Sequence, residues 1–584
     1  MLRRGNYTEG TMATYDLVIR GGLVVDGTGT TEPYAADVGV TGNRIEAVGT
    51  INRSGTEEIN AKGKLVTPGF VDIHTHYDAQ AVWDSHLAPS AWHGVTTAVM
   101  GNCGVGFAPC KPADRDKLVE LMEGVEDIPG AVMNEGLDWQ WESFGEYLDA
   151  LERRTRDMDV CALLPHAAVR VFVMGERALA LENAYQGDIA QMREITRAAM
   201  QAGAFGFSTS RSLSHKTLKG DPTPTLRAQE DELTGIAMGM RDAGAGMLEI
   251  VSEWAPDHKA EFAMLRRVVE ACGRPAVFTL TQRHARPTVW RDLLRYADEA
   301  IADGVNMRPV SAPRAIGVLL GLEGSQNPFS GTPSYKSIAD LPLAERVRRM
   351  RDPAFRAQLL SEDPKKGSTF PLFHRLSYTQ MFRFGPDGNY EPAREDSLAA
   401  IAAREGRTPQ EVAYDALLED DGNAFIYTPL GNYADYDLSV SETTLANRNT
   451  IMGLGDGGAH VAFILDAGYP TWLLTHWGKR KQRWSVQELV RRLTSDTAAA
   501  AGLFDRGVVA PGMKADLNVI DWDRLGCDKP YVVRDLPAGG RRLLQKVHGY
   551  DATIVAGHVT YRGGEATGTL PGRLVRGAQA ALAA

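Results

Sequence analysis

The stretch LVTPGFVDIHTHYD, residues 65–78, decides the fold. Its apolar part is typical of a buried strand, and that strand ends in His74-Thr75-His76. Side chains two residues apart on a strand point to the same side, so we expect both imidazoles to face one way. Two histidines that converge at the carboxyl end of a barrel strand suit a divalent metal. A single His-x-His motif is weak evidence, but the preceding TPGFVD and the β-rich segment before it strengthen the prediction of a metal site.

Both ends of the chain are rich in β-strand signals. Alternating and β-branched apolar residues, broken by Gly-containing turns, fill residues 15–29 and 36–49 near the start. The same pattern returns at 514–523 and 552–564 near the end. We therefore predict one discontinuous β-sandwich domain built from residues 1–64 and 510–584.

The middle of the chain alternates short apolar runs with amphipathic helical stretches, which is the pattern of parallel βα units. Eight such units predict an α/β fold, a (β/α)8 TIM barrel, over residues 65–509. The eight candidate strands are 65–74, 96–102, 160–166, 204–210, 247–253, 276–282, 305–312 and 449–456.

The connection between the seventh and eighth strands is too long for one helix, so we predict an insertion at about 315–445 over the carboxyl face of the barrel. Such insertions serve as lids or substrate-binding subdomains. A contact between subunits, with no part in catalysis, is the alternative.

Composition excludes several classes of protein. With 43% hydrophobic and 23% charged residues, the 584-residue chain has an ordinary globular composition. No apolar run approaches the roughly 18 residues that cross a bilayer, and the first residues lack the apolar core of a signal peptide. The net charge of −11, without a dense Lys/Arg stretch, argues against nucleic acid as a partner. Five cysteines are too few for a disulfide scaffold and favour a cytoplasmic location.

Three motifs together resemble the amidohydrolase superfamily. They are PGFVDIHTH at the first strand, LGDGGAH at 454–460 with Asp456 after the last strand, and LTSDTAAAAGLFDRGVVAPGMKADLNVID at 493–521. They span nearly the whole chain. The resemblance implies a metal-dependent hydrolase in which Asp456 contacts the metal and acts as general base and then general acid. It also implies a homo-oligomer.

Within the superfamily, the chain is most similar to the N-acyl-D-amino-acid deacylase group. GVTTAVMGNCGVGFAPC, residues 94–110, places Cys103 just past the second strand. The resemblance implies that this thiol is a metal ligand in place of a carbamylated lysine, and a thiolate is a good zinc ligand. No lysine lies between Lys117 and Lys216, so strands three and four offer none to carbamylate. The alternative for Cys103 is a small buried apolar residue.

The chain departs from this group at strands five and six, where the resemblance implies histidine ligands. Ser252 and Glu253 stand at the first position, and Thr281 or Gln282 at the second; His284 is the nearest imidazole. Two interpretations stay open. The protein binds one metal through His74, His76, Cys103 and Asp456, with help from Glu253 or His284, or the metal site has decayed.

Further polar residues near the strand ends are candidates for binding substrate. Arginine can hold a carboxylate with two hydrogen bonds, although a structural salt bridge is an equal alternative for each arginine here. A surface network is the alternative for His460. The candidates are His166, Ser208, Arg211, His215, Glu253, His284, Arg314 and His460.

These residues predict hydrolysis of a C–N bond in a small-molecule amide, and the resemblance implies an N-acyl-D-amino acid as substrate. The expected cofactor is a divalent metal, zinc before manganese or iron, as one or two ions. Alternatives are a cyclic amidase acting on a hydantoin, dihydropyrimidine or lactam, a metal-dependent decarboxylase, and a non-catalytic barrel with a decayed site.

Overall fold

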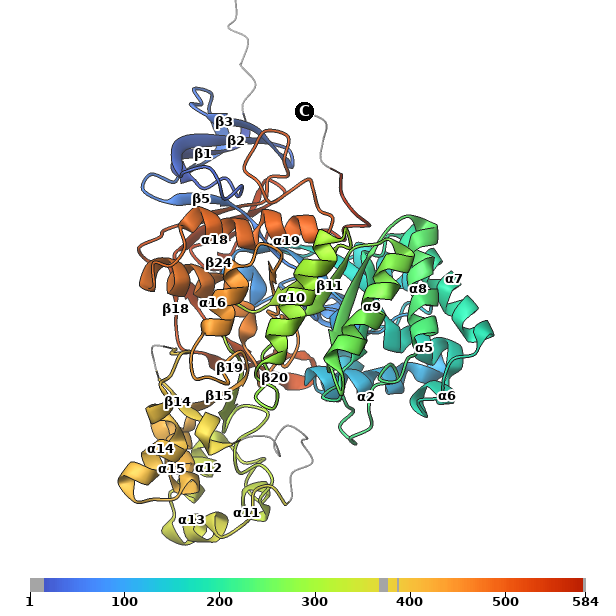
Figure 1. Ribbon diagram of the computed structural model, residues 1–584. Coiled ribbons are helices and arrows are strands. Elements are labelled where there is room, and N and C mark those ends of the chain that lie inside the picture. The colour runs from blue at the N-terminus through green and yellow to red at the C-terminus, as the bar shows by residue number, and fades with distance from the viewer. Residues whose placement is uncertain (1–14, 367–376, 386–387, 581–584) are drawn as a thin grey trace, which may run out of the picture.

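Eight parallel strands form the centre of the protein and follow one another around the sheet in chain order. The computed structural model describes residues 15–366, 377–385 and 388–580. A bridge between Thr75 and Gly457 joins the first and last strands of the set. This arrangement confirms the predicted barrel (Figure 1). The strands are β6 (Phe70–Asp72), β7 (Val95–Met100), β8 (Asp159–Pro165), β9 (Gly206–Arg211), β10 (Met247–Ser252), β11 (Ala276–Thr279), β12 (Met307–Ser311) and β16 (Ile451–Met452).

Helices follow the strands and cover the outside of the barrel. Figure 1 shows α7 to α10 side by side along one flank. Gly203 ends α7 with a φ of 107°, a left-handed conformation that glycine adopts without steric cost. In the described ranges, no helix is both long and apolar enough to cross a membrane. The main helices are α2 (Arg115–Glu126), α4 (Phe144–Glu152), α5 (His166–Met174), α7 (Gln186–Ala202), α8 (Glu230–Ala243), α9 (His258–Cys272), α10 (Val289–Ala302), α16 (Ser439–Ala446), α18 (Val486–Leu493) and α19 (Ser495–Ala500).

A nine-stranded sheet combines strands from both ends of the chain, which confirms the predicted discontinuous β-domain. β5 pairs with β1 on one side and with β17 on the other, and so joins the two parts. Because β5 begins at Leu65, it lies just past the predicted boundary at residue 64, and the division into domains stays a prediction. The strands are β1 (Tyr15–Val24), β2 (Tyr34–Thr41), β3 (Arg44–Gly49), β4 (Gly55–Asn60), β5 (Leu65–Pro68), β17 (Leu517–Ile520), β22 (Tyr550–Val555), β23 (His558–Arg562) and β24 (Glu565–Ala566).

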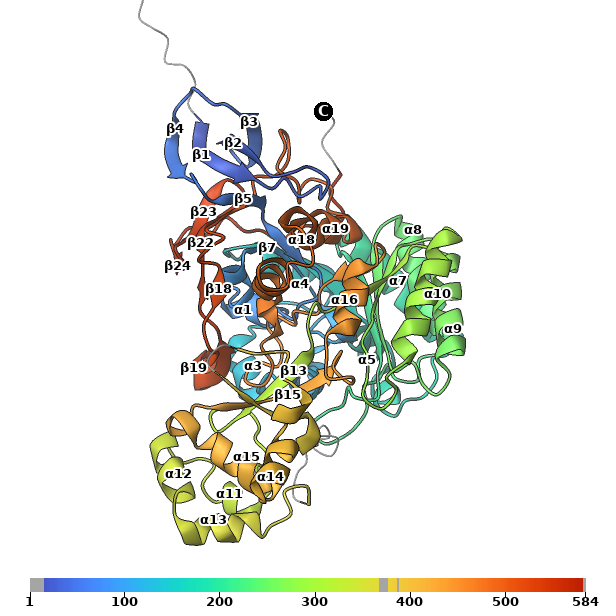
Figure 2. The same cartoon turned by 60° about the vertical axis from the view of Figure 1, so that its left-hand side comes forward.

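The insertion after β12 folds around an apolar core of its own. Figures 1 and 2 both show it, in yellow, at the opposite end of the molecule from β1 to β3. Val318 and Gly431 form bridges with Ile464 and Arg283, which lie in loops at the carboxyl face of the barrel. The insertion contains an antiparallel sheet of β13 (Ile316–Gly321), β14 (Phe382–Phe384) and β15 (Phe425–Gly431), with α11 (Pro333–Lys336), α12 (Leu343–Met350), α13 (Pro353–Leu360), α14 (Leu398–Glu405) and α15 (Pro409–Leu417).

The C-terminal segment covers the amino end of the barrel. The N–H of Val160 donates to the carbonyl of Arg573 over 2.9 Å, and the N–H of Val575 donates to the carbonyl of Val160 over 2.8 Å. Beside them, buried Asp159 pairs with Arg506 at 2.7 Å and with Lys514 at 3.1 Å. Because these charges are paired and buried, removal of one partner would leave an uncompensated buried charge at this face.

Candidate metal centre

His74 and His76 lie directly after β6, at the carboxyl end of the barrel. Between them, the N–H of Thr75 donates to the carbonyl of Val99 over 3.0 Å, which continues the strand pairing. Both imidazoles therefore lie on one side of the chain, as the sequence predicts, with ring centroids 5.5 Å apart. Both side chains are buried.

Cys103 lies in a tight loop after β7, and its thiol faces the histidines. Its Sγ is 3.5 Å from Nε2 of His74. The backbone of Cys103 has a φ of 57°, an uncommon left-handed conformation for a residue with a Cβ. Asn102 fixes the loop by donating from Nδ2 to the carbonyls of Thr75 and Val99, over 3.0 and 2.9 Å.

Asp456 approaches the same point from the loop after β16. Its N–H donates to the carbonyl of His74 over 3.2 Å, which fixes this loop against the first strand. Its Oδ1 is 3.4 Å from Nε2 of His74 and 3.8 Å from Nε2 of His76. Four donor groups from three strand ends thus meet at one place.

This donor set fits a divalent metal. Among the described residues, His74, His76 and Cys103 each offer a ligand atom within 4.8 Å of the other two. Neither ring nitrogen of buried His76 has a hydrogen-bond partner in the structure, and buried polar atoms are rarely left without one. Imidazole, thiolate and carboxylate together are typical zinc ligands.

Burial strongly disfavours charge at this centre. It lowers the pKa of His74 to about 3, helped by the charge of His215, and holds the pKa of His76 well below its usual range. Burial, with repulsion from Asp466 and Asp72, raises the pKa of Asp456 to about 8. Burial also raises the pKa of the Cys103 thiol. A bound cation reverses this preference, because it stabilises the deprotonated ligands.

Two buried glutamates at this centre were not predicted from the sequence. Glu126 ends α2 and lies beside His76, while Glu249 lies in the middle of β10 and faces His74. The signal for Glu249 was one acidic residue within the apolar run MLEIV, on a strand whose every residue is buried. For Glu126 the local sequence carries no comparable signal, because it is one of several acidic residues in α2.

Four of the residues predicted to bind substrate form hydrogen bonds or ion pairs with other residues of the protein. His166 contacts Thr209 through Nδ1 at 2.8 Å and Glu232 through Nε2 at 2.9 Å. Ser208 donates to the carbonyl of Gly101 and accepts the N–H of Gly104, so it supports the Cys103 loop. Arg211 pairs with Glu261 and Arg314 with Asp466, the salt bridges that the sequence left open. Their role toward substrate stays a prediction.

Glu253 and His284, which were considered as replacement metal ligands, contact other residues. Glu253 pairs with Arg283 and accepts the N–H of Leu213 over 3.1 Å. His284 contacts the carbonyl of Pro429 in the insertion, at 3.0 Å from Nε2. In the part of the chain that the structure describes, neither belongs to the His74, His76 and Cys103 cluster.

His215 and His460 flank the centre and are partly exposed. Nδ1 of His215 lies 2.8 Å from the hydroxyl of Ser210, and Nε2 of His460 lies 3.4 Å from Glu126. Burial lowers the pKa of each imidazole to about 4, so both are neutral near pH 7. Their contact with a substrate stays a prediction.

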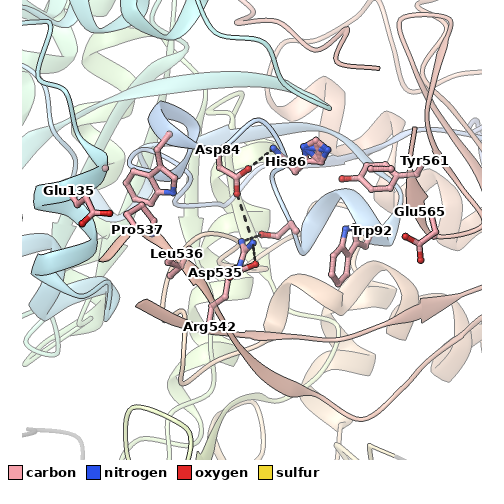
Figure 3. A pocket seen from close by; sticks show the side chains of 15 residues that line it. Asp84, His86, Trp92, Glu135, Asp535, Leu536, Pro537, Arg542, Tyr561 and Glu565 are labelled. Carbon is pink, nitrogen blue, oxygen red and sulfur yellow. Dashed lines mark hydrogen bonds and ion pairs between the residues drawn. The ribbon is translucent and has the colours of Figure 1, made fainter. Parts of the chain in front are cut away.

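A cavity of 670 Å³ lies apart from this centre (Figure 3). It opens between α1 (Gln80–Trp83), the turn Ser90–His93 and the hairpin of β19 (Tyr531–Leu536) and β20 (Gly540–Leu544). Figure 3 shows Arg542 among the lining residues, paired with Asp535 and Asp84. None of the four converging donor residues lines it.

Comparisons with known proteins agree with this geometry. The amidohydrolase family matches residues 57–561. An uncharacterized protein of Mycobacterium bovis is 28% identical over 606 aligned positions, which cover 96% of this chain and 94% of that protein. The D-aminoacylase of Alcaligenes xylosoxydans xylosoxydans is 34% identical over 251 residues, which cover 41% of this chain and 47% of the enzyme.

The fold is also similar to a solved structure of D-aminoacylase, an enzyme described with a binuclear metal centre, one-metal activation and second-metal attenuation. The TM-score is 0.64 at 22% sequence identity, with 96% of this chain and 100% of that chain covered. These matches confirm the predicted likeness to the D-aminoacylase group. The chain belongs to the amidohydrolase family and is a hydrolase acting on carbon–nitrogen bonds.

Proposed function

We propose that this protein is a metal-dependent deacylase that hydrolyses the amide bond of an N-acyl-D-amino acid or a related N-acyl compound. One observation carries the proposal: Nε2 of His74, Nε2 of His76, Sγ of Cys103 and Oδ1 of Asp456 converge at the strand ends of a D-aminoacylase-like fold. The similarity to D-aminoacylase supports the substrate class.

The proposed cofactor is one zinc ion. The positions at strands five and six hold Ser252, Glu253 and Gln282 where histidine ligands were expected. Gln282 is committed elsewhere, since its side chain donates to Asp435 over 2.7 Å and accepts the N–H of Ala434 over 2.9 Å. One-metal activation of the similar D-aminoacylase supports a centre that works with a single ion.

Asp456 is the proposed general base. When bound, the metal supplies Lewis-acid polarisation of the amide carbonyl and lowers the pKa of water. Asp456 takes a proton from the attacking water and delivers it to the nitrogen of the leaving amine. Its carboxylate is held for this by the hydrogen bond from its own N–H to the carbonyl of His74. His215 and His460 flank the approaching substrate as neutral imidazoles.

Metal analysis and a substrate screen test the proposal. We expect about one equivalent of zinc in protein purified without chelator, and hydrolysis of N-acetyl-D-amino acids in preference to hydantoins and aryl amides. His74→Ala should lose both zinc and activity, because it removes a ligand, whereas His558→Ala, at an exposed position in β23, should keep both. Full activity in His74→Ala would contradict the assignment of this metal site. Hydantoin hydrolysis alone would favour the cyclic amidase, and failure to take up any metal would favour a decayed site.

A further inference from the structure

Glu126 and Glu249 lie behind the two histidines, on the side away from Asp456. Oε1 of Glu126 is 3.4 Å from Nδ1 of His76, and Oε1 of Glu249 is 3.9 Å from Nδ1 of His74. The Nε2 atoms of the same rings face Asp456, at 3.4 Å from His74 and 3.8 Å from His76. Each ring therefore presents Nε2 to the donor cluster and Nδ1 to a glutamate of its own.

Among the described residues, three of these four facing atoms lack a hydrogen-bond partner. Oε1 of Glu126, Oε1 of Glu249 and Nδ1 of His76 are buried and make no hydrogen bond in the structure. Burying a carboxyl oxygen without a hydrogen-bond partner costs free energy of folding. The position of each glutamate oxygen beside an imidazole nitrogen therefore needs an explanation. When Nε2 of an imidazole binds a metal, Nδ1 carries the proton and becomes a hydrogen-bond donor.

The second oxygen of each glutamate reaches another part of the centre. Oε2 of Glu249 accepts the N–H of Cys103 over 3.0 Å, so this carboxylate contacts both a histidine and the backbone of the cysteine. Oε2 of Glu126 is 3.4 Å from Nε2 of His460, and the carbonyl of Glu126 accepts the N–H of His460. Each glutamate thus connects a ligand histidine to a second loop.

We propose that Glu126 and Glu249 are positioning residues, which accept the Nδ1 protons of His76 and His74 and hold both rings with Nε2 toward the metal. The inference rests on the proposed metal site and adds to it. It also gives strand five a role: β10 supplies a carboxylate behind the ligands from its middle, whereas its end carries Ser252 and Glu253 in place of histidine.

Glu126→Gln and Glu249→Gln test the inference, with zinc affinity as the readout. Glutamine has one acceptor oxygen for two donors, so we expect zinc affinity, measured by competition with a chelator, to fall roughly 10- to 100-fold in each variant. The matched control is Glu232→Gln, because Glu232 is also buried and also contacts a histidine, His166, outside the centre. Its zinc affinity should match the wild type.

Cobalt(II) substitution separates positioning from direct ligation. We expect the visible bands of the cobalt form to keep their positions in both glutamine variants, because the ligands are unchanged. Changed bands would overturn the inference by showing that a glutamate binds the metal directly. If a glutamine variant does not fold, zinc affinity is measured on Glu249→Asp or Glu126→Asp instead. These variants keep the charge but shorten the side chain.

The outcomes for the two proposals can be told apart. Wild-type protein that binds zinc, with glutamine and aspartate variants of unchanged affinity, would overturn the positioning role and leave the metal site standing. Wild-type protein that binds no zinc would overturn both.

Discussion

The thiol of Cys103 is placed by its neighbours as much as by its own conformation. Gly101 and Gly104 flank the Asn102-Cys103 pair with φ values of 85° and 69°. A Cβ on Gly104 would lie 2.8 Å from the backbone N of Ser210 and 2.9 Å from Cα of Thr209. The cysteine loop therefore rests directly on β9, without room for any side chain at this glycine.

Gly104→Ala should weaken metal binding although it changes none of the proposed ligand residues. The new methyl group must push the loop away from β9, because its close contacts are to backbone. We expect zinc affinity to fall at least about tenfold, by the loss of ligand geometry. Gly63→Ala is the control, since Gly63 has a φ of 77° but nothing within 4 Å of the added Cβ. Equal zinc affinity in the two variants would contradict this account of the loop.

At the residue scale, local motifs pointed to side chains that the structure brings together, while the roles of these residues stay a prediction. His74, His76 and Asp456 could be selected because they end the first and last strands, and Cys103 because its surroundings resemble a known group. Glu126 and Glu249 were missed because only the packing of α2 and β10 brings them to the centre. The flanking sequence does not show this packing. Arg211 was left open for a related reason: its partner Glu261 lies on α9, and only the fold brings them together.

At the scale of elements, hydrogen bonds join the loop after β11 to the insertion. They reach the residues that directly follow β15. The backbone of Gln282 exchanges hydrogen bonds with Asn432, donating to its Oδ1 over 2.8 Å and accepting its N–H over 3.0 Å. The side chain of Gln282 adds bonds to Ala434 and Asp435. One residue at the end of strand six thus anchors the insertion over the barrel.

Gln282→Ala should loosen the insertion. The change removes the side-chain hydrogen bonds to the N–H of Ala434 and to exposed Asp435, a loss of about 0.5–1.5 kcal/mol for each bond. We expect limited proteolysis to cut within the insertion several times faster than in the wild type. Gln229→Ala, at the exposed start of α8, is the control and should be cut at the wild-type rate. An unchanged cleavage rate in Gln282→Ala would show that other contacts hold the insertion.

Sequence patterns predicted the eight barrel strands in order, but not every element boundary. Residues 65–74 read as one strand, yet the chain changes sheets at Gly69: β5 joins the nine-stranded sheet and β6 opens the barrel. A Cβ on Gly69 would lie 2.2, 2.4 and 2.8 Å from three side-chain atoms of Thr96, so the crossing between sheets needs glycine at this position. Apolar spacing alone cannot show such a crossing, because both halves are equally buried.

At the scale of the whole molecule, His93 links acid pH to stability. It is fully buried beside α17 (Tyr469–Trp472), with Nδ1 2.8 Å from the hydroxyl of Thr471. Burial, with the charge of Arg314, lowers the pKa of His93 to about 3. In the unfolded chain it titrates near about 6.5. The neutral form therefore stabilises the fold fully above pH 6.5, and this stabilisation is lost as the pH falls toward 3.

His93→Asn should reduce the acid sensitivity of the fold. We expect the wild type to lose about 1–2 kcal/mol through this group between pH 8 and pH 5.5, and the variant to lose none of it. The measurement is the drop in thermal-unfolding midpoint between the two pH values, with exposed His558→Asn as the control. The same drop in wild type and His93→Asn would contradict the role of His93.

The overall architecture was predictable because its signals are spread along the chain: β-rich ends, repeated βα units and one long gap before Asp456. The sheet within the insertion was not predicted, since β13 and β15 pair across more than a hundred intervening residues. The cytoplasmic location, the homo-oligomer and the domain boundaries stay predictions.

The bridge between Thr75 and Gly457 has a consequence for the order of events during synthesis. His74, His76 and Cys103 leave the ribosome early, whereas Asp456 emerges only after most of the chain has been made. A nascent chain can offer a metal three of the four donors, and the fourth arrives when the last strand meets the first. On the proposed metal site, firm retention of metal by the newly made protein would therefore report that its barrel has closed.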